Sequence, residues 1–195
     1  PGRSYSVFDG DTPSASTVVA SGIESQEPIL FYLDRDASLF PRRFYRVEIE
    51  EPKVEAGLKA EYFSGMNFDN LVLTRVDHVV DFDWGRGSPA AEVPEEQFSV
   101  RWTGSLIIKT SGSYIFWTNS DDGVRLKIAD ETVIENWTDH SATSDWGNLT
   151  LSEGMHPIVL EFYEKGGDAV MQLENRGPGI ARQTIPGSML AHEPW

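Results

Sequence analysis

The sequence contains no cysteine, which excludes disulfide bonds, thiolate metal sites and cysteine nucleophiles. It also has no apolar run that approaches the ~20 residues of a membrane-spanning helix. The spacing of apolar residues gives no amphipathic helix longer than two turns. These absences point to a fold held together by strand pairing and an apolar core, and we expect no direct membrane insertion.

Positive charge is scarce, because 16 Lys and Arg face 31 Asp and Glu and the net charge is −15. A nucleic-acid partner is therefore not expected, since a phosphate backbone needs a basic surface. The acidic balance also argues against anionic membranes. It fits a solvated extracellular surface or one that collects cations. The start at Pro1-Gly2-Arg3 is not a signal peptide, and we expect a fragment of a larger protein.

Short β-branched and aromatic runs recur between Gly, Pro, Asn, Asp and Ser, which predicts strands. The pattern is typical of an all-β fold, an antiparallel β-sandwich or barrel. A length of 195 residues suits one or two domains. We place a boundary near Glu51-Pro52-Lys53. A small β segment (residues 1–52) then precedes a larger β-sandwich domain (residues 53–195).

Strands are expected on both sides of this boundary. In the small segment they are Tyr5–Phe8, Thr17–Ser21, Ile29–Tyr32 and Phe44–Ile49. In the larger domain they are Leu58–Phe63, Leu71–Asp77, Val79–Phe82, Phe98–Thr103, Leu106–Lys109, Ser113–Asn119, Val124–Ile128, Ile158–Tyr163 and Val170–Glu174. Asp83–Pro89 and Asn136–Asn148 are expected as loops, and Arg176–Trp195 as an extended strap. Trp102, Tyr114 and Phe116 are expected in the core.

The most informative stretch is Ser120-Asp121-Asp122-Gly123, which directly follows an aromatic-rich strand. Neighbouring like charges repel each other, and Asp is a poor strand residue. A divalent cation would relieve the repulsion, because calcium takes carboxylate oxygens. An Asp-Gly pair is also a good hairpin turn. The pattern alone leaves both interpretations open.

Several stretches in one order resemble the PA-14 (protective-antigen-type) domain, a lectin-like β-sandwich, over about residues 57–194. They are Gly57–Phe63, Phe98–Gly104, Ser111–Phe116, Ser120–Leu126 and Gly154–Glu164. The segment 1–52 resembles, more weakly, the fibronectin-like segments beside such modules in bacterial surface proteins.

The resemblance implies a calcium site. In sugar-binding members, two adjacent aspartates are joined by a cis peptide and coordinate the ion, and two sugar hydroxyls complete the shell. Asp121 and Asp122 match these positions. A second loop supplies further ligands, and here it is the stretch Glu164-Lys165-Gly166-Gly167-Asp168. We expect backbone contributions from Gly166 and Gly167 and a side-chain ligand from Asp168.

Other residues are expected to contact the sugar beside Asp121 and Asp122. Trp137, His140 and Trp146 lie in the expected Asn136–Asn148 loop, where aromatic rings can stack on the apolar face of a sugar. A structural plug is the other interpretation of this Trp pair. Lys165 is expected to contact the ligand from the second loop.

No Gly-x-Ser-x-Gly, His-Glu-x-x-His or phosphate-loop motif occurs, and within the family catalysis belongs to other domains. We therefore expect a non-enzymatic, calcium-dependent carbohydrate-binding (lectin or adhesion) module. Its partner would be a glycan or monosaccharide, and its parent a secreted or cell-surface bacterial protein that carries it as a monomeric module. The alternatives are a structural spacer without a ligand and an accessory domain of a larger glycoside hydrolase.

Overall fold

The computed structural model describes residues 3–10, 17–25, 44–50 and 54–193. The chain forms two compact units, Pro1–Lys53 and Val54–Trp195, so the division lies one residue after the expected position. Within the described ranges the only helix is a short 3-10 helix, η2 (Gly187–Met189). None of the described residues forms a helix with the length and apolar character needed to cross a membrane.

The first unit contains an antiparallel sheet with the strand order β2-β1-β3. Its strands are β1 (Arg3–Gly10), β2 (Thr17–Ser25) and β3 (Phe44–Glu50). Each includes one of the strands expected from the sequence. The fourth expected strand, Ile29–Tyr32, lies outside the described residues.

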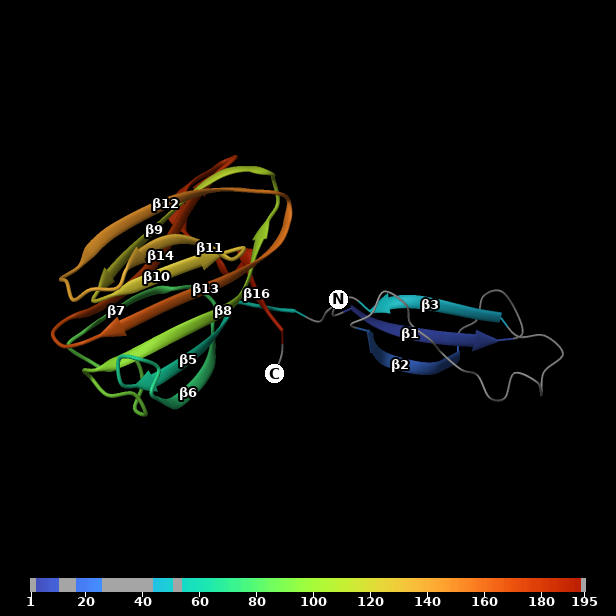
Figure 1. Cartoon of the computed structure of the whole chain (residues 1–195), viewed down its shortest axis with the longest axis horizontal. Helices are drawn as coiled ribbons and strands as arrows, with labels where there is room; N and C mark the ends of the chain where they lie inside the picture. Colours follow the sequence, from blue (N-terminus) through green and yellow to red (C-terminus); the bar gives the residue numbers. More distant parts are fainter. Residues whose placement is uncertain (1–2, 11–16, 26–43, 51–53, 194–195) are drawn as a thin grey trace. The chain divides into compact units, whose positions relative to one another are not determined.

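The second unit contains two antiparallel sheets (Figure 1). The first has eight strands, with the order β11-β10-β13-β8-β16-β4, with β5 also paired to β8 and with β6 paired to β5. These strands are β4 (Glu55–Ala56), β5 (Leu58–Ser64), β6 (Asn70–Asp77), β8 (Phe98–Ile108), β10 (Val124–Ile128), β11 (Glu131–Asn136), β13 (Gly154–Glu164) and β16 (Leu190–His192).

The second sheet has five strands, with the order β12-β9-β14-β15 and with β7 paired to β14. Its strands are β7 (Asp81–Gly85), β9 (Gly112–Asp121), β12 (Thr143–Leu151), β14 (Ala169–Gly177) and β15 (Ile180–Thr184). In Figure 1, β12, β9 and β14 form one layer and β10, β13 and β8 the other. The expected all-β, antiparallel sandwich is confirmed.

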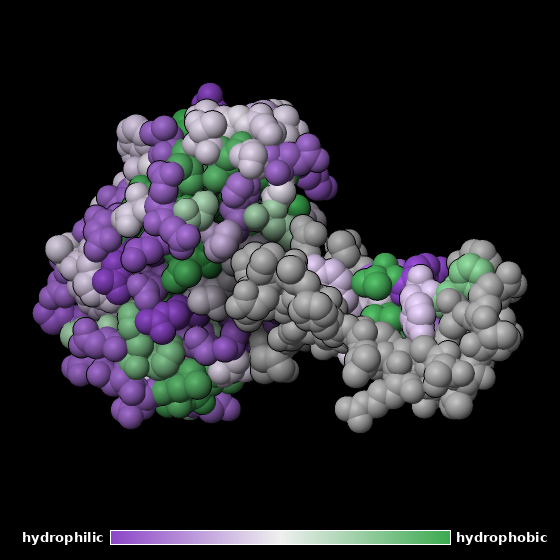
Figure 2. Space-filling view, turned by 45° about the vertical axis from the view of Figure 1, so that its right-hand side comes forward, coloured by the Kyte–Doolittle hydropathy of each residue, from purple (hydrophilic) through white to green (hydrophobic). Residues whose placement is uncertain are grey.

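The core lies between these two sheets, because each strand buries every second side chain. Trp102 and Phe116 are 0% exposed and Tyr114 is 1% exposed, so all three occupy the core as expected. Hydrophilic residues cover most of the visible surface of this unit, with small separate apolar patches between them (Figure 2). This surface agrees with the large negative charge of the sequence.

Gly104 lets one long strand pass close to its neighbour. A Cβ atom at this position would lie 2.4 Å from the carbonyl oxygen of Ala191 in β16. Two separate strands, Phe98–Thr103 and Leu106–Lys109, were expected here from the sequence. The structure instead shows one continuous strand, β8, because glycine permits close backbone approach without interrupting the pairing.

A buried carboxylate braces the packing of β5, β6 and β8. Asp77 Oδ2 accepts hydrogen bonds from Tyr62 Oη (2.6 Å) and Trp102 Nε1 (2.8 Å). Its other oxygen accepts one from Arg75 Nε (2.7 Å). Asp77 is only 6% exposed, so its charge depends on these three donors in place of water. Burial and the neighbouring Asp77 carboxylate raise the pKa of Tyr62 well above its usual range.

Three segments expected to be irregular contain strands. The expected Asp83–Pro89 loop begins inside β7, and the expected Asn136–Asn148 loop contains the start of β12. The expected strap Arg176–Trp195 contains β15 and β16. In β12 the exposed positions alternate with half-buried ones. The half-buried Thr143, Asp145 and Gly147 are not apolar, so the sequence lacks the alternation of apolar and polar residues that identifies a strand.

We predict that Asp77→Asn lowers the free energy of unfolding by about 3 kcal/mol, because it removes one partner of a buried, hydrogen-bonded ion pair. Urea denaturation measures this loss. The matched control Asp130→Asn changes an exposed carboxylate and should shift stability by less than about 0.5 kcal/mol. Equal stability of the two variants would show that Asp77 does not brace the core.

Candidate metal and ligand-binding site

Three carboxylates meet at one end of the sandwich. Asp121, Asp122 and Glu164 each place an oxygen within 4.8 Å of the other two. Asp121 is the last residue of β9 in the five-stranded sheet, and Glu164 is the last residue of β13 in the eight-stranded sheet. The cluster therefore forms where strands from both sheets end.

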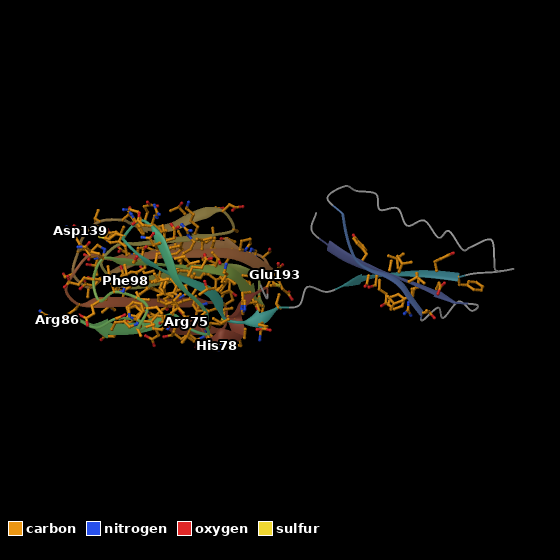
Figure 3. The ribbon with its side chains drawn as sticks, turned by 90° about the horizontal axis from the view of Figure 1, so that it is seen from below. Arg75, His78, Arg86, Phe98, Asp139 and Glu193 are labelled. Carbon is orange, nitrogen blue, oxygen red and sulfur yellow. The ribbon has the colours of Figure 1, made fainter. Side chains whose placement is uncertain are left out.

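Charged side chains beside the cluster mark the same end of the unit. Asp139 accepts a hydrogen bond from the Lys165 ammonium, and Arg86 Nε lies 3.5 Å from Asp168 Oδ1. Figure 3 shows Asp139 and Arg86 at one end of the second unit and Glu193 at the other. The loop from residue 164 to residue 168 is thus held at the end that carries the carboxylates.

The peptide bond between Asp121 and Asp122 is cis, as the resemblance implied. Backbone amides from two loops orient both carboxylates. Asp122 Oδ1 accepts a hydrogen bond from the His140 amide and Oδ2 accepts one from the Lys165 amide, each at 2.9 Å. The Ala142 amide donates to Asp121 Oδ2 at 3.0 Å. The side chains of the pair are therefore fixed before any ligand arrives.

Glu164 is the most unusual member of the cluster. It is 0% exposed, and neither carboxylate oxygen has a well-formed hydrogen bond among the described residues. Burial, followed by the charges of Asp122 and Asp121, raises the pKa of Glu164 to about 8. The nearby Gly166 amide offsets only part of this rise. A buried carboxylate without a partner is costly, so this position calls for a positive ligand.

The three carboxylates of the cluster repel one another. Burial, and then the neighbouring Asp122 charge, raises the pKa of Asp121. Asp139, outside the cluster, behaves in the opposite way, because hydrogen bonds from Lys165 and Tyr163 lower its pKa. Crowded carboxylates with few protein cations among them suit a hard cation that takes oxygen ligands.

Contacts among the side chains around Tyr163 and Trp137 support the site. The Tyr163 hydroxyl donates to Asp139 Oδ1 at 2.8 Å, and its ring meets Trp137 edge to face at 4.8 Å between centroids. The Arg125 guanidinium lies over the Trp137 ring at 4.0 Å, and Phe68 stacks on it at 6.0 Å. Trp137 is thus packed among side chains at the start of the loop 137–142, which connects β11 to β12.

The other residues expected in the site lie at different places. His140 contributes its backbone amide to Asp122, and its buried Nε2 has no partner among the described residues. Gly166 and Gly167 form the turn between β13 and β14, where Gly167 has a φ of +116°. Asp168 lies outside the group of three carboxylates, and its side chain is 66% exposed.

Trp146 does not lie in the loop that the sequence suggested. It lies in β12, directly opposite Trp117 of β9. Trp117 precedes Asp121 by four residues, a distance of about 13 Å along a strand. The structure therefore separates Trp146 from Trp137 and His140, which adjoin the carboxylates.

Glu164 was not expected as a ligand, although it begins the stretch expected as the second loop. A signal for it was present. Ile158, Leu160 and Phe162 form the core-facing series of β13, and Glu164 continues this period of two. A carboxylate on the buried face of a strand needs a partner, and the partner here is missing from the described residues.

The PA14 domain family matches residues 55–188. The chain belongs to this family. The anti-sigma-I factor RsgI3 of Acetivibrio thermocellus is 35% identical over 136 residues, which are 69% of this chain and 21% of that protein. An anti-sigma factor domain-containing protein from Clostridium clariflavum has a TM-score of 0.67 and 34% identity over 70% of this chain and 47% of that one.

The PA14 sugar-binding domain from an RTX adhesin has the same fold, with a TM-score of 0.60 and 21% identity over 70% of this chain and 98% of that domain. The expected PA14 membership is thereby confirmed. This chain spans about a fifth of the anti-sigma-I factor and about half of the Clostridium clariflavum protein. The shared part is therefore a module within each of those relatives.

We predict that Gly123→Ala destabilises the site. The new Cβ would lie 2.2 Å from Tyr163 Cε1, so the ring must move, and overpacking of this kind costs about 2 kcal/mol. Thermal or urea denaturation gives the change. Gly166→Ala is the matched control, because its Cβ would meet nothing closer than 3.6 Å. A wild-type stability for Gly123→Ala would mean that Tyr163 is not held against this backbone.

Proposed function

We propose that the second unit is a calcium-dependent carbohydrate-binding module without catalytic activity of its own. The observation that carries this proposal is Glu164, a fully buried carboxylate that lies against Asp121 and Asp122 and has no hydrogen-bond partner among the described residues. A bound dication would offset the repulsion among the three charges. It would also supply the missing partner of Glu164.

The donors suit calcium better than softer metals. The three side chains offer only carboxylate oxygens, and the unit has no cysteine. Calcium takes six to eight oxygens in a flexible shell, whereas zinc and copper favour nitrogen and sulfur. The Gly166–Gly167 turn directly follows Glu164 and Lys165, so its carbonyl groups are candidate sources of further oxygens. Asp168 is a candidate ligand at the rim of the site.

Sugar recognition is proposed to use the exposed side of the same site. A bound calcium ion supplies coordination positions that two neighbouring sugar hydroxyls can occupy. The loop 137–142 and the side chain of Lys165, which is 55% exposed, would contact the sugar beside the ion. Membership of the PA14 family and the fold shared with the sugar-binding domain of an RTX adhesin support this choice of ligand.

The module is proposed to work outside the cell as part of a larger protein. Adhesion is one role, and the adhesin among its structural neighbours supports it. The 35% identity with an anti-sigma-I factor favours a second role, in which sugar binding serves as the input of a sensor. The rest of the parent chain separates these roles, because a sensor needs a segment that binds a sigma factor inside the cell.

We predict that Glu164→Gln and Asp122→Asn each lower calcium affinity at least tenfold, or about 1.4 kcal/mol, in titration calorimetry. Burial raises the pKa of Glu164 to about 8, so keeping this acid in the calcium-free fold costs free energy at neutral pH. Without calcium, Glu164→Gln should therefore be at least as stable as the wild type. Asp168→Asn tests whether the rim residue is a ligand. Glu153→Gln is the control, because Glu153 is exposed and precedes the opposite end of β13.

Two outcomes would contradict the proposal in different ways. Unchanged calcium affinity in Glu164→Gln and Asp122→Asn would remove the metal site. Calcium binding that only raises the melting temperature, with no response to any monosaccharide in a panel, would support the spacer interpretation. The expected result is sugar binding that chelation of calcium abolishes.

A further inference from the structure

A groove of about 280 Å³ lies on the five-stranded sheet. Its lining residues come from five strands and are Asp81, Asn119, Ser144, Gln172, Glu174, Arg182 and Thr184. The sheet register places Ser144, Asn119, Gln172 and Asp81 side by side across β12, β9, β14 and β7. The outward positions of β9 alternate with the buried core positions, so the groove lies on the outer face of the sheet.

Hydrogen bonds hold the amide groups of this groove in fixed orientations. Asn119 Nδ2 donates to Gln172 Oε1 at 3.0 Å, and Gln172 Nε2 donates to Asp81 Oδ1 at 2.7 Å. In the described part of the chain, the side-chain oxygen Oδ1 of Asn119 has no protein partner, and neither have the hydroxyl groups of Ser144 and Thr184. Ordered neutral donors and acceptors suit a ligand rich in hydroxyl groups.

Aromatic and paired charged groups flank this polar row. Trp146 is 64% exposed, the largest exposure among the large apolar residues described, and it lies opposite Trp117. The Arg182 guanidinium covers the Trp117 ring at 4.4 Å and pairs with Glu174 Oε2 at 2.7 Å through Nε. Arg182 therefore holds Trp117 on the sheet and leaves Trp146 as the open aromatic platform.

The groove lies near the carboxylate cluster, because both include residues of β9. Asn119 precedes Asp121 by two residues in β9, a distance of about 7 Å along a strand, and both occupy outward positions. The volume is near the lower limit of about 300 Å³ for small-molecule pockets. The groove lies beside the metal ligands and does not include them. A ligand that occupies both places must therefore be a section of a chain and not an isolated compact molecule.

We propose that the outer face of the five-stranded sheet binds a neutral polysaccharide. One sugar of this chain occupies the calcium site, and further sugar residues lie in the groove. The proposal rests on the proposed function for its ligand class. Trp146 stacks on a sugar ring, and the row from Ser144 to Gln172 bonds the hydroxyl groups of the next residue. A neutral chain is favoured because the protein carries a net charge of −15 and the groove itself contains Asp81 and Glu174 beside one arginine.

The test compares soluble polysaccharides on the whole 195-residue chain. Mixed-linkage β-glucan, xyloglucan, galactomannan and arabinan serve as neutral probes, and polygalacturonate as the anionic one. Affinity electrophoresis and calorimetry are run with calcium for the wild type, Trp146→Ala and Gln172→Ala. Leu71→Ala is the matched control, because Leu71 is 54% exposed and lies in β6 of the other sheet.

We expect Trp146→Ala and Gln172→Ala each to weaken binding of a neutral polysaccharide at least fivefold. Their calcium affinity, their monosaccharide affinity and the binding by Leu71→Ala should equal those of the wild type. Wild-type polysaccharide affinity in both groove variants would overturn the proposal, as would binding of polygalacturonate alone. If no polysaccharide binds, the groove proposal also fails, while the calcium and monosaccharide titrations decide the proposed function separately.

Discussion

The repulsion among three closely placed carboxylates is the constraint around which this end of the domain is built. Asp121 and Asp122 receive backbone hydrogen bonds from two loops, but in the described part of the chain Glu164 is buried without a comparable donor. Packing gives no reason to place a third negative charge there. A cation that joins strands from both sheets gives such a reason, because each of its ligands would come from a strand that the sandwich already holds in place.

The rest of the domain holds these ligands at fixed positions. Asp77 ties β5, β6 and β8 together beneath the core. At the site itself, Tyr163 fills the space that Gly123 leaves open and donates to Asp139. The loops that bond Asp122 are therefore fastened to packed strands. On the outer face of the five-stranded sheet, Asn119 and Gln172 extend the ordered polar surface away from the cluster.

Much of the fold followed from the sequence, because alternating apolar residues identify strands and core positions such as Trp102 and Phe116. Strand β12 was missed because its half-buried Thr143, Asp145 and Gly147 are not apolar, so no period of two appears in the sequence. Asp121 and Asp122 stood out as adjacent like charges. Glu164 did not, although it continues the buried period of two in β13, because its closeness to Asp121 and Asp122 depends on where strands of the two sheets end in space. The separation of Trp146 from Trp137 likewise depends on register, which composition does not encode.

A crystal structure of the calcium-loaded protein tests the central claim most directly, with anomalous scattering to identify the ion. The account predicts one calcium ion with oxygen ligands from Asp121, Asp122 and Glu164 at about 2.3–2.6 Å. A structure at saturating calcium in which Glu164 stays uncoordinated, or in which the ion lies away from the Asp121–Asp122 pair, would contradict it.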